Sequence, residues 1–246
     1  GGRTLAIVPG AFKPPHLGHL SMVKQYASEA DEVIVLISSP LKASRGIGGK
    51  AMSAQDSKKI WDMLLADQGL SNVRVEISPK PSPVMATYEY IGDEGPLKPG
   101  TKLVLGASQK GGDFKRWSGA AKYVKDGVEL LQPAKTAVIP ANRPNGEPYS
   151  ATDARKMLEQ GENADEFLGD GRTEDVRSIL GLDASLEEMS AAGGGAVQGF
   201  AVNKDDEEER KTLTREQNKK TKHPPYNELE LYKEVLKLLM KEGIIK

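Results

Sequence analysis

Cysteine is absent from the 246 residues of this chain. Disulfide bonds, thiolate nucleophiles and metal sites with cysteine ligands are therefore excluded, and the composition fits a reducing compartment. Long apolar runs are also lacking: none approaches the roughly 20 residues that a membrane-spanning helix requires, and the first residues do not resemble a signal peptide. We therefore expect a cytoplasmic protein with no membrane partner. We interpret the Gly-Gly start as a cleavage scar or as the end of a product cut from a longer precursor.

Excess charge of one sign is lacking as well, because 34 Lys and Arg face 35 Asp and Glu. This balance argues against a protein that coats nucleic acid, and we expect no nucleic-acid partner. The charge is nevertheless uneven along the chain. Residues 1–160 hold 21 basic and 16 acidic side chains, a net of +5, whereas residues 161–246 hold 13 and 19, a net of −6. The mildly basic first part suits an anionic small ligand, and the acidic remainder is interpreted as a different module.

Short apolar runs that end in turn residues alternate with segments of helical character through the first two thirds of the chain. The runs predict five strands and the other segments predict helices. Strands are expected at 4–10, 31–39, 73–78, 101–108 and 136–142, and helices at 17–29, 53–69, 82–91 and 150–161. The alternation predicts an α/β fold, namely a Rossmann-like, doubly wound parallel sheet of five strands with helices on both faces. Such sheets bind ligands beyond the C-terminal ends of their strands.

The character of the chain changes after residue 182. We assign residues 1–182 to the α/β domain and residues 183–225, which are rich in glycine and in charge, to a flexible linker. Residues 226–246 carry apolar side chains at helical spacing and are expected to form an amphipathic helical appendage. We expect this helix to dock on its own domain or on a second copy, which would give a homo-oligomer. A frayed helix on a disordered tail is the alternative.

Histidine is scarce, yet two of the three histidines lie within the segment PGAFKPPHLGHL, residues 9–20. The segment joins the first expected strand to the first expected helix. A helix start there aims its unpaired N–H groups and the positive end of its dipole at a bound phosphate. Two glycines let the backbone approach closely, a lysine adds positive charge, and the histidines can donate hydrogen bonds to phosphate oxygens. These residues are Gly10, Lys13, His16, Gly18 and His19.

The same segment resembles the G-x-F-x-P-x-H-x-G-H signature of the nucleotidylyltransferase superfamily. The matching residues are Gly10, Phe12, Pro14, His16, Gly18 and His19. A second signature of that superfamily, S-x-T-x-x-R at the start of a late helix, is matched by Ser150, Thr152 and Arg155. The resemblance extends over residues 3 to 160 and implies that the second motif holds the triphosphate tail of a nucleotide. Taken alone, that motif is better explained as the start of a well-capped surface helix, but its position after the fifth expected strand and downstream of the first motif favours the nucleotide-binding interpretation.

A third element of the superfamily, G-x-D followed by a tryptophan, is matched only in part. Gly106 is present, but Ser108 stands where the superfamily has aspartate. We expect either a changed mode of holding the substrates or a substitute carboxylate from Asp113. Trp117 can stack on a flat ring of the acceptor, or it is an ordinary aromatic residue of an amphipathic helix. Lys42, in the basic loop after the second expected strand, either contacts an acceptor phosphate or is a solvated lysine.

The reaction that the resemblance implies is transfer of a nucleoside monophosphate from a nucleoside triphosphate to a phosphate-bearing acceptor, with release of pyrophosphate. An acceptor phosphate is already anionic near neutral pH, so alignment and charge stabilisation suffice without a general base. The resemblance implies catalytic roles for Lys13, His16, His19 and Arg155; nucleotide binding by Gly10, Ala11, Phe12, Gly18, Gly106, Ser150 and Thr152; and acceptor binding by Lys42 and Trp117. Mg²⁺ is expected to bind through the substrate phosphates and water, with no protein ligand.

ATP is the preferred donor and nicotinamide mononucleotide the preferred acceptor, which would give NAD. A cytidylyltransferase that uses CTP and an alcohol or sugar phosphate is one alternative. A catalytically retired fold that serves as a nucleotide-binding or structural module is another. A class I aminoacyl-tRNA synthetase is disfavoured, because the segment KAMS at residues 50–53 follows the second expected strand and not the last ones.

Overall fold

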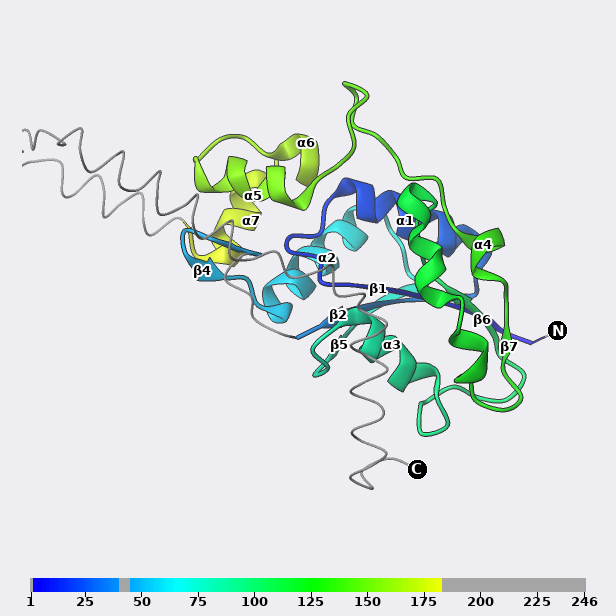
Figure 1. Cartoon of the computed structure of the whole chain (residues 1–246). Coiled ribbons are helices and arrows are strands. Elements are labelled where there is room, and N and C mark those ends of the chain that lie inside the picture. The colour runs from blue at the N-terminus through cyan, green and yellow to red at the C-terminus, as the bar shows by residue number, and fades with distance from the viewer. Residues whose placement is uncertain (1, 40–44, 183–246) are drawn as a thin grey trace, which may run out of the picture. The chain divides into compact units, whose positions relative to one another are not determined.

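The computed structural model describes residues 2–39 and 45–182, in which a parallel β-sheet is covered by helices (Figure 1). Its five strands lie in the order β5-β2-β1-β6-β7. They are β1 Thr4–Gly10, β2 Glu32–Ser38, β5 Val73–Ser78, β6 Lys102–Leu105 and β7 Glu129–Leu130. Every neighbouring pair in this sheet is parallel. The predicted Rossmann-like α/β class with five strands is therefore confirmed, and the strand order reverses at β1.

Helices cover both faces of the sheet, as the alternation of strands and helices predicts. Helices α1 and α2 lie on one face and α3 on the opposite face (Figure 1). The helices are α1 Leu17–Glu29, α2 Ala54–Asp67, α3 Pro83–Ile91, α4 Pro133–Thr136, α5 Ala151–Glu159, α6 Asp165–Leu168 and α7 Thr173–Leu180. Two 3-10 segments, η2 Lys110–Trp117 and η3 Ala120–Lys122, follow β6. The sheet is thus the middle layer of three.

Strand β1, at the centre of the sheet, is buried on both faces, which explains why its sequence is continuously apolar and does not alternate. Ala6 and Val8 pack into the core that α1 and α2 share, whereas Ile7 lies between them in sequence and points to the other face. All three side chains are fully buried. A strand with helices on both of its faces has no solvent side, so a continuous apolar run is the expected pattern.

The fifth predicted strand, residues 136–142, is wrong. The fifth strand of the sheet is the two-residue β7, and Val138 contributes only an isolated parallel bridge to Ser108. Pro133 starts α4, whose last turn reaches Ala137 through a hydrogen bond from Ala137 N–H to the Pro133 carbonyl. Proline is favourable at the start of a helix, so Pro133 favours helix α4 over a strand at this point of the chain. The apolar run buries Ala137 and Val138 without becoming a strand.

The described part of the loop after β2 contains a small hairpin that the sequence did not indicate. Strands β3 Gly46–Ile47 and β4 Lys50–Ala51 are antiparallel. Gly48 and Gly49 connect them with φ angles of 57° and 75°, a left-handed conformation that suits glycine and gives the tightest hairpin turn. The Gly48 N–H donates to Glu159 Oε1 over 3.2 Å, which ties the hairpin to α5.

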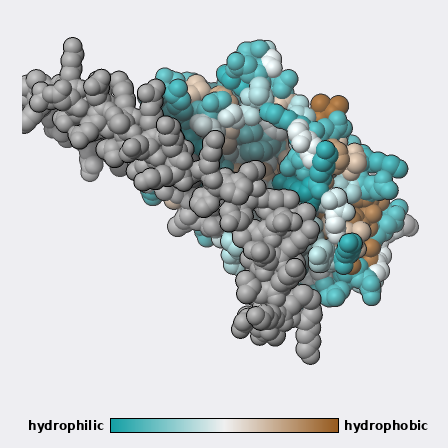
Figure 2. Space-filling view, viewed as in Figure 1, coloured by the Kyte–Doolittle hydropathy of each residue, from teal (hydrophilic) through white to brown (hydrophobic). Residues whose placement is uncertain are grey.

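Several predictions fall on residues outside the described ones. These are Lys42, the linker at 183–225 and the C-terminal amphipathic helix at 226–246 with its proposed role in oligomer formation. Within residues 2–39 and 45–182, no helix has the length and apolar character needed to cross a bilayer. Figure 2 shows that hydrophilic residues dominate the visible described surface, with hydrophobic residues in small patches.

Candidate active site

The two sequence motifs meet at the carboxyl end of β1. Strand β1 ends at Gly10 and α1 begins at Leu17, so the loop between them lies at the switch point of the sheet (Figure 1). Arg155, on α5, donates from Nη1 to the carbonyl oxygen of Lys13 in this loop over 2.5 Å. Residues separated by 142 positions in the chain are thereby joined at one place.

His16 is the N-cap of α1, which explains the spacing of the two histidines. Its Nδ1 accepts a hydrogen bond from the backbone N–H of His19 over 3.3 Å, the standard reach from an N-cap to the third helical residue. Because Nδ1 accepts, the ring hydrogen of neutral His16 is on Nε2, which is left as a donor. The cap therefore sets the tautomer of a candidate catalytic side chain.

Burial keeps both imidazoles neutral. It lowers the pKa of His16 from 6.5 to about 4. It also lowers the pKa of His19 well below its ordinary value, and the nearby charge of His16, when protonated, lowers it further. Both rings are then hydrogen-bond donors without a positive charge at neutral pH. A bound phosphate would favour the protonated forms of both rings, because an opposite charge stabilises the cation.

Aromatic contacts hold the histidine pair in place. The rings of His16 and His19 stack with centroids 3.6 Å apart and planes 16° apart. Tyr149 stacks on His16 at 5.8 Å, and Phe12 meets His19 edge-on at 5.0 Å. Tyr149 is a site residue that sequence reasoning missed. The available signal was its position directly before Ser150, the cap residue of the second motif.

The motif glycines make room for these aromatic rings. A Cβ atom at Gly10 would lie 2.5 Å from the Phe12 ring, and one at Gly18 would lie 2.7 Å from Tyr149 Cβ. Phe12 itself has a φ of 48°, which is unusual for a residue with a side chain. The hydroxyl of Ser57 on α2 donates to the Phe12 carbonyl and secures this conformation. The close approaches that the glycines permit are therefore to protein rings.

The second motif forms the N-terminal turn of α5. Ser150 Oγ caps the helix by accepting from the Asp153 N–H over 3.3 Å. Arg155 Nη2 donates to Thr152 Oγ1 over 3.1 Å. Burial lowers the pKa of Arg155, and the positive charge of Arg45 lowers it further. A helix start, a half-buried guanidinium and a second nearby arginine together attract anions.

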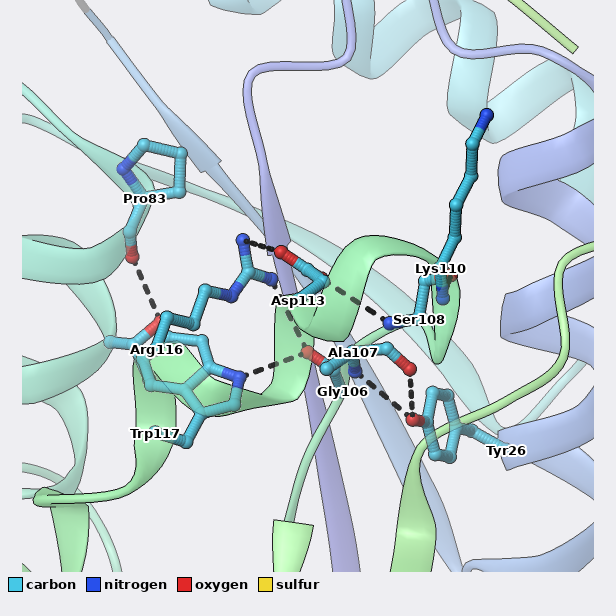
Figure 3. Close-up of polar contacts among 10 residues, drawn as sticks. Tyr26, Pro83, Gly106, Ala107, Ser108, Lys110, Asp113, Arg116 and Trp117 are labelled. Atoms are coloured by element: carbon cyan, nitrogen blue, oxygen red, sulfur yellow. Dashed lines mark hydrogen bonds and ion pairs between the residues drawn. The ribbon is translucent and has the colours of Figure 1, made fainter. Parts of the chain in front are cut away.

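A hydrogen-bonded cluster surrounds the peptide that follows β6 (Figure 3). Trp117 Nε1 and Arg116 Nη2 donate to the Gly106 carbonyl over 3.3 and 3.4 Å. Asp113 Oδ2 accepts from the Ser108 N–H over 3.2 Å, and Oδ1 pairs with Arg116 at 3.3 Å. The structure thus brings the Asp113 carboxylate next to Ser108, at the position where the superfamily aspartate is missing.

The opposite side of this peptide is secured by Tyr26 of α1. Its hydroxyl oxygen accepts from the Ala107 N–H over 3.1 Å (Figure 3). It also lies 2.9 Å from the Thr136 carbonyl, to which it can donate. Gly106 has no space for a side chain, because a Cβ there would lie 2.9 Å from the Ile7 carbonyl. Trp117 is 1% exposed. Its buried indole has no free face on which a ligand ring could stack, which favours the interpretation of Trp117 as an ordinary packed aromatic residue.

The donors that converge at the end of β1 suit phosphate oxygens. They are the N–H groups of imidazole, guanidinium and a helix start, and Lys13 is buried beside them at 3% exposure. Within the described ranges, no group of three or more His, Cys, Asp or Glu side chains could hold a metal ion. A divalent cation that enters with a nucleotide would fit here through the phosphate oxygens and water. Magnesium binding stays a prediction.

Comparison with known proteins agrees with this geometry. A family model described as cytidylyltransferase-like matches residues 7–157, which include both motifs. A Pyrobaculum aerophilum protein named nicotinamide-nucleotide adenylyltransferase is 32% identical over 106 residues, or 40% of this chain and 54% of that protein. The chain therefore spans about half the length of this curated relative.

Solved structures are similar in fold at low sequence identity. A bifunctional NMN adenylyltransferase/ADP ribose pyrophosphatase from Francisella tularensis matches with a TM-score of 0.51 and 12% identity, covering 81% of this chain and 58% of that one. A structure of such an enzyme from the same organism, complexed with AMP and a manganese ion, has a TM-score of 0.47 and 13% identity, covering 82% and 58%. At 12% identity, the likeness to the first of these structures supports the fold alone.

Proposed function

Because the chain belongs to the cytidylyltransferase-like family of nucleotidylyltransferases, we propose that it transfers AMP from ATP to a phosphate-bearing acceptor and releases pyrophosphate. The observation that carries the proposal is the contact between Arg155 and the Lys13 carbonyl, which joins the two motifs of the superfamily. Nicotinamide mononucleotide is the proposed acceptor, with NAD as product. The Pyrobaculum aerophilum relative, whose name gives it this activity, supports that choice.

In the proposed reaction an acceptor phosphate oxygen attacks the α-phosphorus of ATP. The new bond is a P–O–P bridge, and the bond between the α-phosphorus and the oxygen bridging to the β-phosphate breaks. The pyrophosphate leaves with the electron pair of that bond. No proton has to be removed from an ionised acceptor phosphate, so the protein has only to align the reactants and stabilise the charge that moves.

The position of each site residue indicates its role in this reaction. His16 and His19 would donate from Nε2 to the oxygens of the α-phosphate, where charge develops in the transition state. Arg155 and the N-terminal turn of α5 would hold the leaving pyrophosphate. Arg155 already has two partners, the Lys13 carbonyl and Thr152. It therefore approaches a phosphate from a fixed position. A magnesium ion bound with the nucleotide would neutralise phosphate charge.

Asp113 is proposed to hold the acceptor or the nucleotide in place of the missing aspartate at position 108. Its carboxylate is about one-third exposed and is oriented by Ser108 and Arg116, so one side of it is open to a ligand. A hydroxyl group of a ribose is the kind of donor that such a carboxylate accepts. Asp113→Asn keeps the shape and the acceptor oxygen but removes the charge. It would raise the KM for the substrate that Asp113 holds more than the KM for the other substrate.

A coupled substrate screen tests the proposed function. ATP and CTP are each incubated with nicotinamide mononucleotide, phosphopantetheine, a sugar phosphate and an alcohol phosphate, and both pyrophosphate and the coupled product are measured by mass spectrometry. We expect NAD and pyrophosphate in equal amounts with ATP and nicotinamide mononucleotide. Product from CTP and an alcohol or sugar phosphate would support the cytidylyltransferase alternative instead. ATP binding without turnover across the whole panel would support the retired, nucleotide-binding fold.

A further inference from the structure

Two buried nitrogen atoms beside the candidate active site lack hydrogen-bond partners within the described residues. They are Nδ1 of His19 and Nε1 of Trp61, a residue of α2. Trp61 is fully buried, and the two ring centroids are 6.5 Å apart. Buried polar atoms in proteins are nearly always paired, directly or through an ordered water. Two such atoms so close together call for a common explanation.

The two atoms are chemically complementary. An indole N–H can only donate, and a neutral imidazole has one donor and one acceptor nitrogen. A single water molecule that accepts from Trp61 Nε1 and donates to His19 Nδ1 would satisfy both atoms. Phe12 packs against both rings, because it meets His19 at 5.0 Å and Trp61 at 5.1 Å and is nearly perpendicular to each.

We propose that Trp61 is a positioning residue for His19: through one buried water, its indole N–H keeps His19 Nδ1 as an acceptor and the ring hydrogen on Nε2. This inference rests on the proposed function for its catalytic meaning. The nitrogen that carries the hydrogen in a histidine ring is set by the bond that the other nitrogen makes. His16 is held in the same tautomer by a different device, the backbone N–H of His19.

The consequence is a matched pair of donors. The two rings are stacked 3.6 Å apart and nearly parallel, and equal tautomers give each of them an Nε2–H donor. If His19 carried its hydrogen on Nδ1 instead, its Nε2 would be an acceptor and would repel a phosphate oxygen. Trp61 thus decides whether one or two imidazoles of the pair can bind the α-phosphate.

Nitrogen NMR of the full chain tests the tautomer directly. The imidazole ¹⁵N shifts of the three histidines are recorded at pH 7, and the His19 signals are identified with His19→Ala. We expect hydrogen on Nε2 of His19 in the native chain and a shift toward the Nδ1 form in Trp61→Phe, which keeps an aromatic ring but loses the donor. The control is Ile60→Val, which trims a fully buried neighbour on the same helix without removing a polar atom.

Kinetics provides the second readout. In Trp61→Phe we expect kcat for AMP transfer to fall about fivefold, the effect of one lost hydrogen bond, while Ile60→Val changes it little. If Trp61→Phe does not fold, a benzothiophene analogue of tryptophan at position 61 replaces the N–H with sulfur and keeps the bicyclic shape. An unchanged His19 tautomer in a folded variant would overturn the inference, as would hydrogen on Nδ1 in the native chain. A tautomer shift in a protein that transfers no AMP would refute the proposed function and leave the positioning role intact.

Discussion

The burial of His16 predicts a specific loss of stability in mild acid. Its pKa is about 4 in the folded chain against 6.5 in the ordinary state, so the unfolded chain binds more protons between these two values. Stability therefore decreases as the pH falls through that window and is fully present above pH 6.5. The difference of about 2.5 pKa units corresponds to about 3 kcal/mol at pH 4, and to about 2 kcal/mol already at pH 5.

His16→Asn is the substitution that isolates this effect. Asparagine is a good N-cap, and its side-chain oxygen can replace Nδ1 as the acceptor for the His19 N–H. The variant keeps the cap of α1 but has no group at this position that binds a proton. We expect its free energy of unfolding to decrease between pH 7 and pH 5 by about 2 kcal/mol less than that of the native chain.

Urea unfolding at pH 7, 6 and 5, followed by circular dichroism, measures both proteins under the same conditions. His19 and the carboxylates contribute to the pH dependence of stability in both proteins. The difference between the pH dependence of the native chain and that of His16→Asn therefore reports His16. Equal pH dependence of the native chain and His16→Asn would refute the reasoning, because it would mean that His16 titrates normally in the folded state. The same variant should lose AMP transfer, since asparagine does not reach the position of the Nε2 donor.

Three further predictions follow from the site geometry. His19→Ala should lower kcat by roughly 100-fold, the scale of losing one preorganised donor, and a near-normal rate in steady-state assays would contradict its role. Arg155→Lys should lose both contacts, to the Lys13 carbonyl and to Thr152, and weaken pyrophosphate inhibition at least as much as it lowers kcat. Gly18→Ala should cost about 1–3 kcal/mol in thermal or urea unfolding, because its Cβ would lie 2.7 Å from Tyr149 Cβ. Tyr149→Gly removes that Cβ and should relieve most of the cost of Gly18→Ala in the double variant, and a full, additive loss would show that the clash is not the cause.

The core of the fold could be predicted because its signals are local. Four of the five strands follow from local patterns: three from continuous apolar runs, and the edge strand β5 from apolar residues that alternate with Arg74 and Glu76. The fifth could not, since β7 has two residues and offers no pattern, while the more apolar run at 136–142 begins at the last residue of α4 and pairs with the sheet only through an isolated bridge at Val138. A buried apolar segment that is not a strand has the same sequence pattern as a strand. Only tertiary packing distinguishes the two.

The candidate site likewise has some features that local sequence patterns determine and others that only long-range contacts determine. The sequence by itself determined where α1 begins and that Ser150 caps α5, because the spacing from Ser150 to Asp153 lies within one helical turn. The cap that His16 provides to α1 was found only in the structure. Only the tertiary structure decided what those turns face. Its long-range contacts brought Arg155 to the Lys13 carbonyl, buried Trp117, and placed Tyr149 and Trp61 beside the imidazoles. Such contacts join residues far apart in the chain, and no local spacing records them.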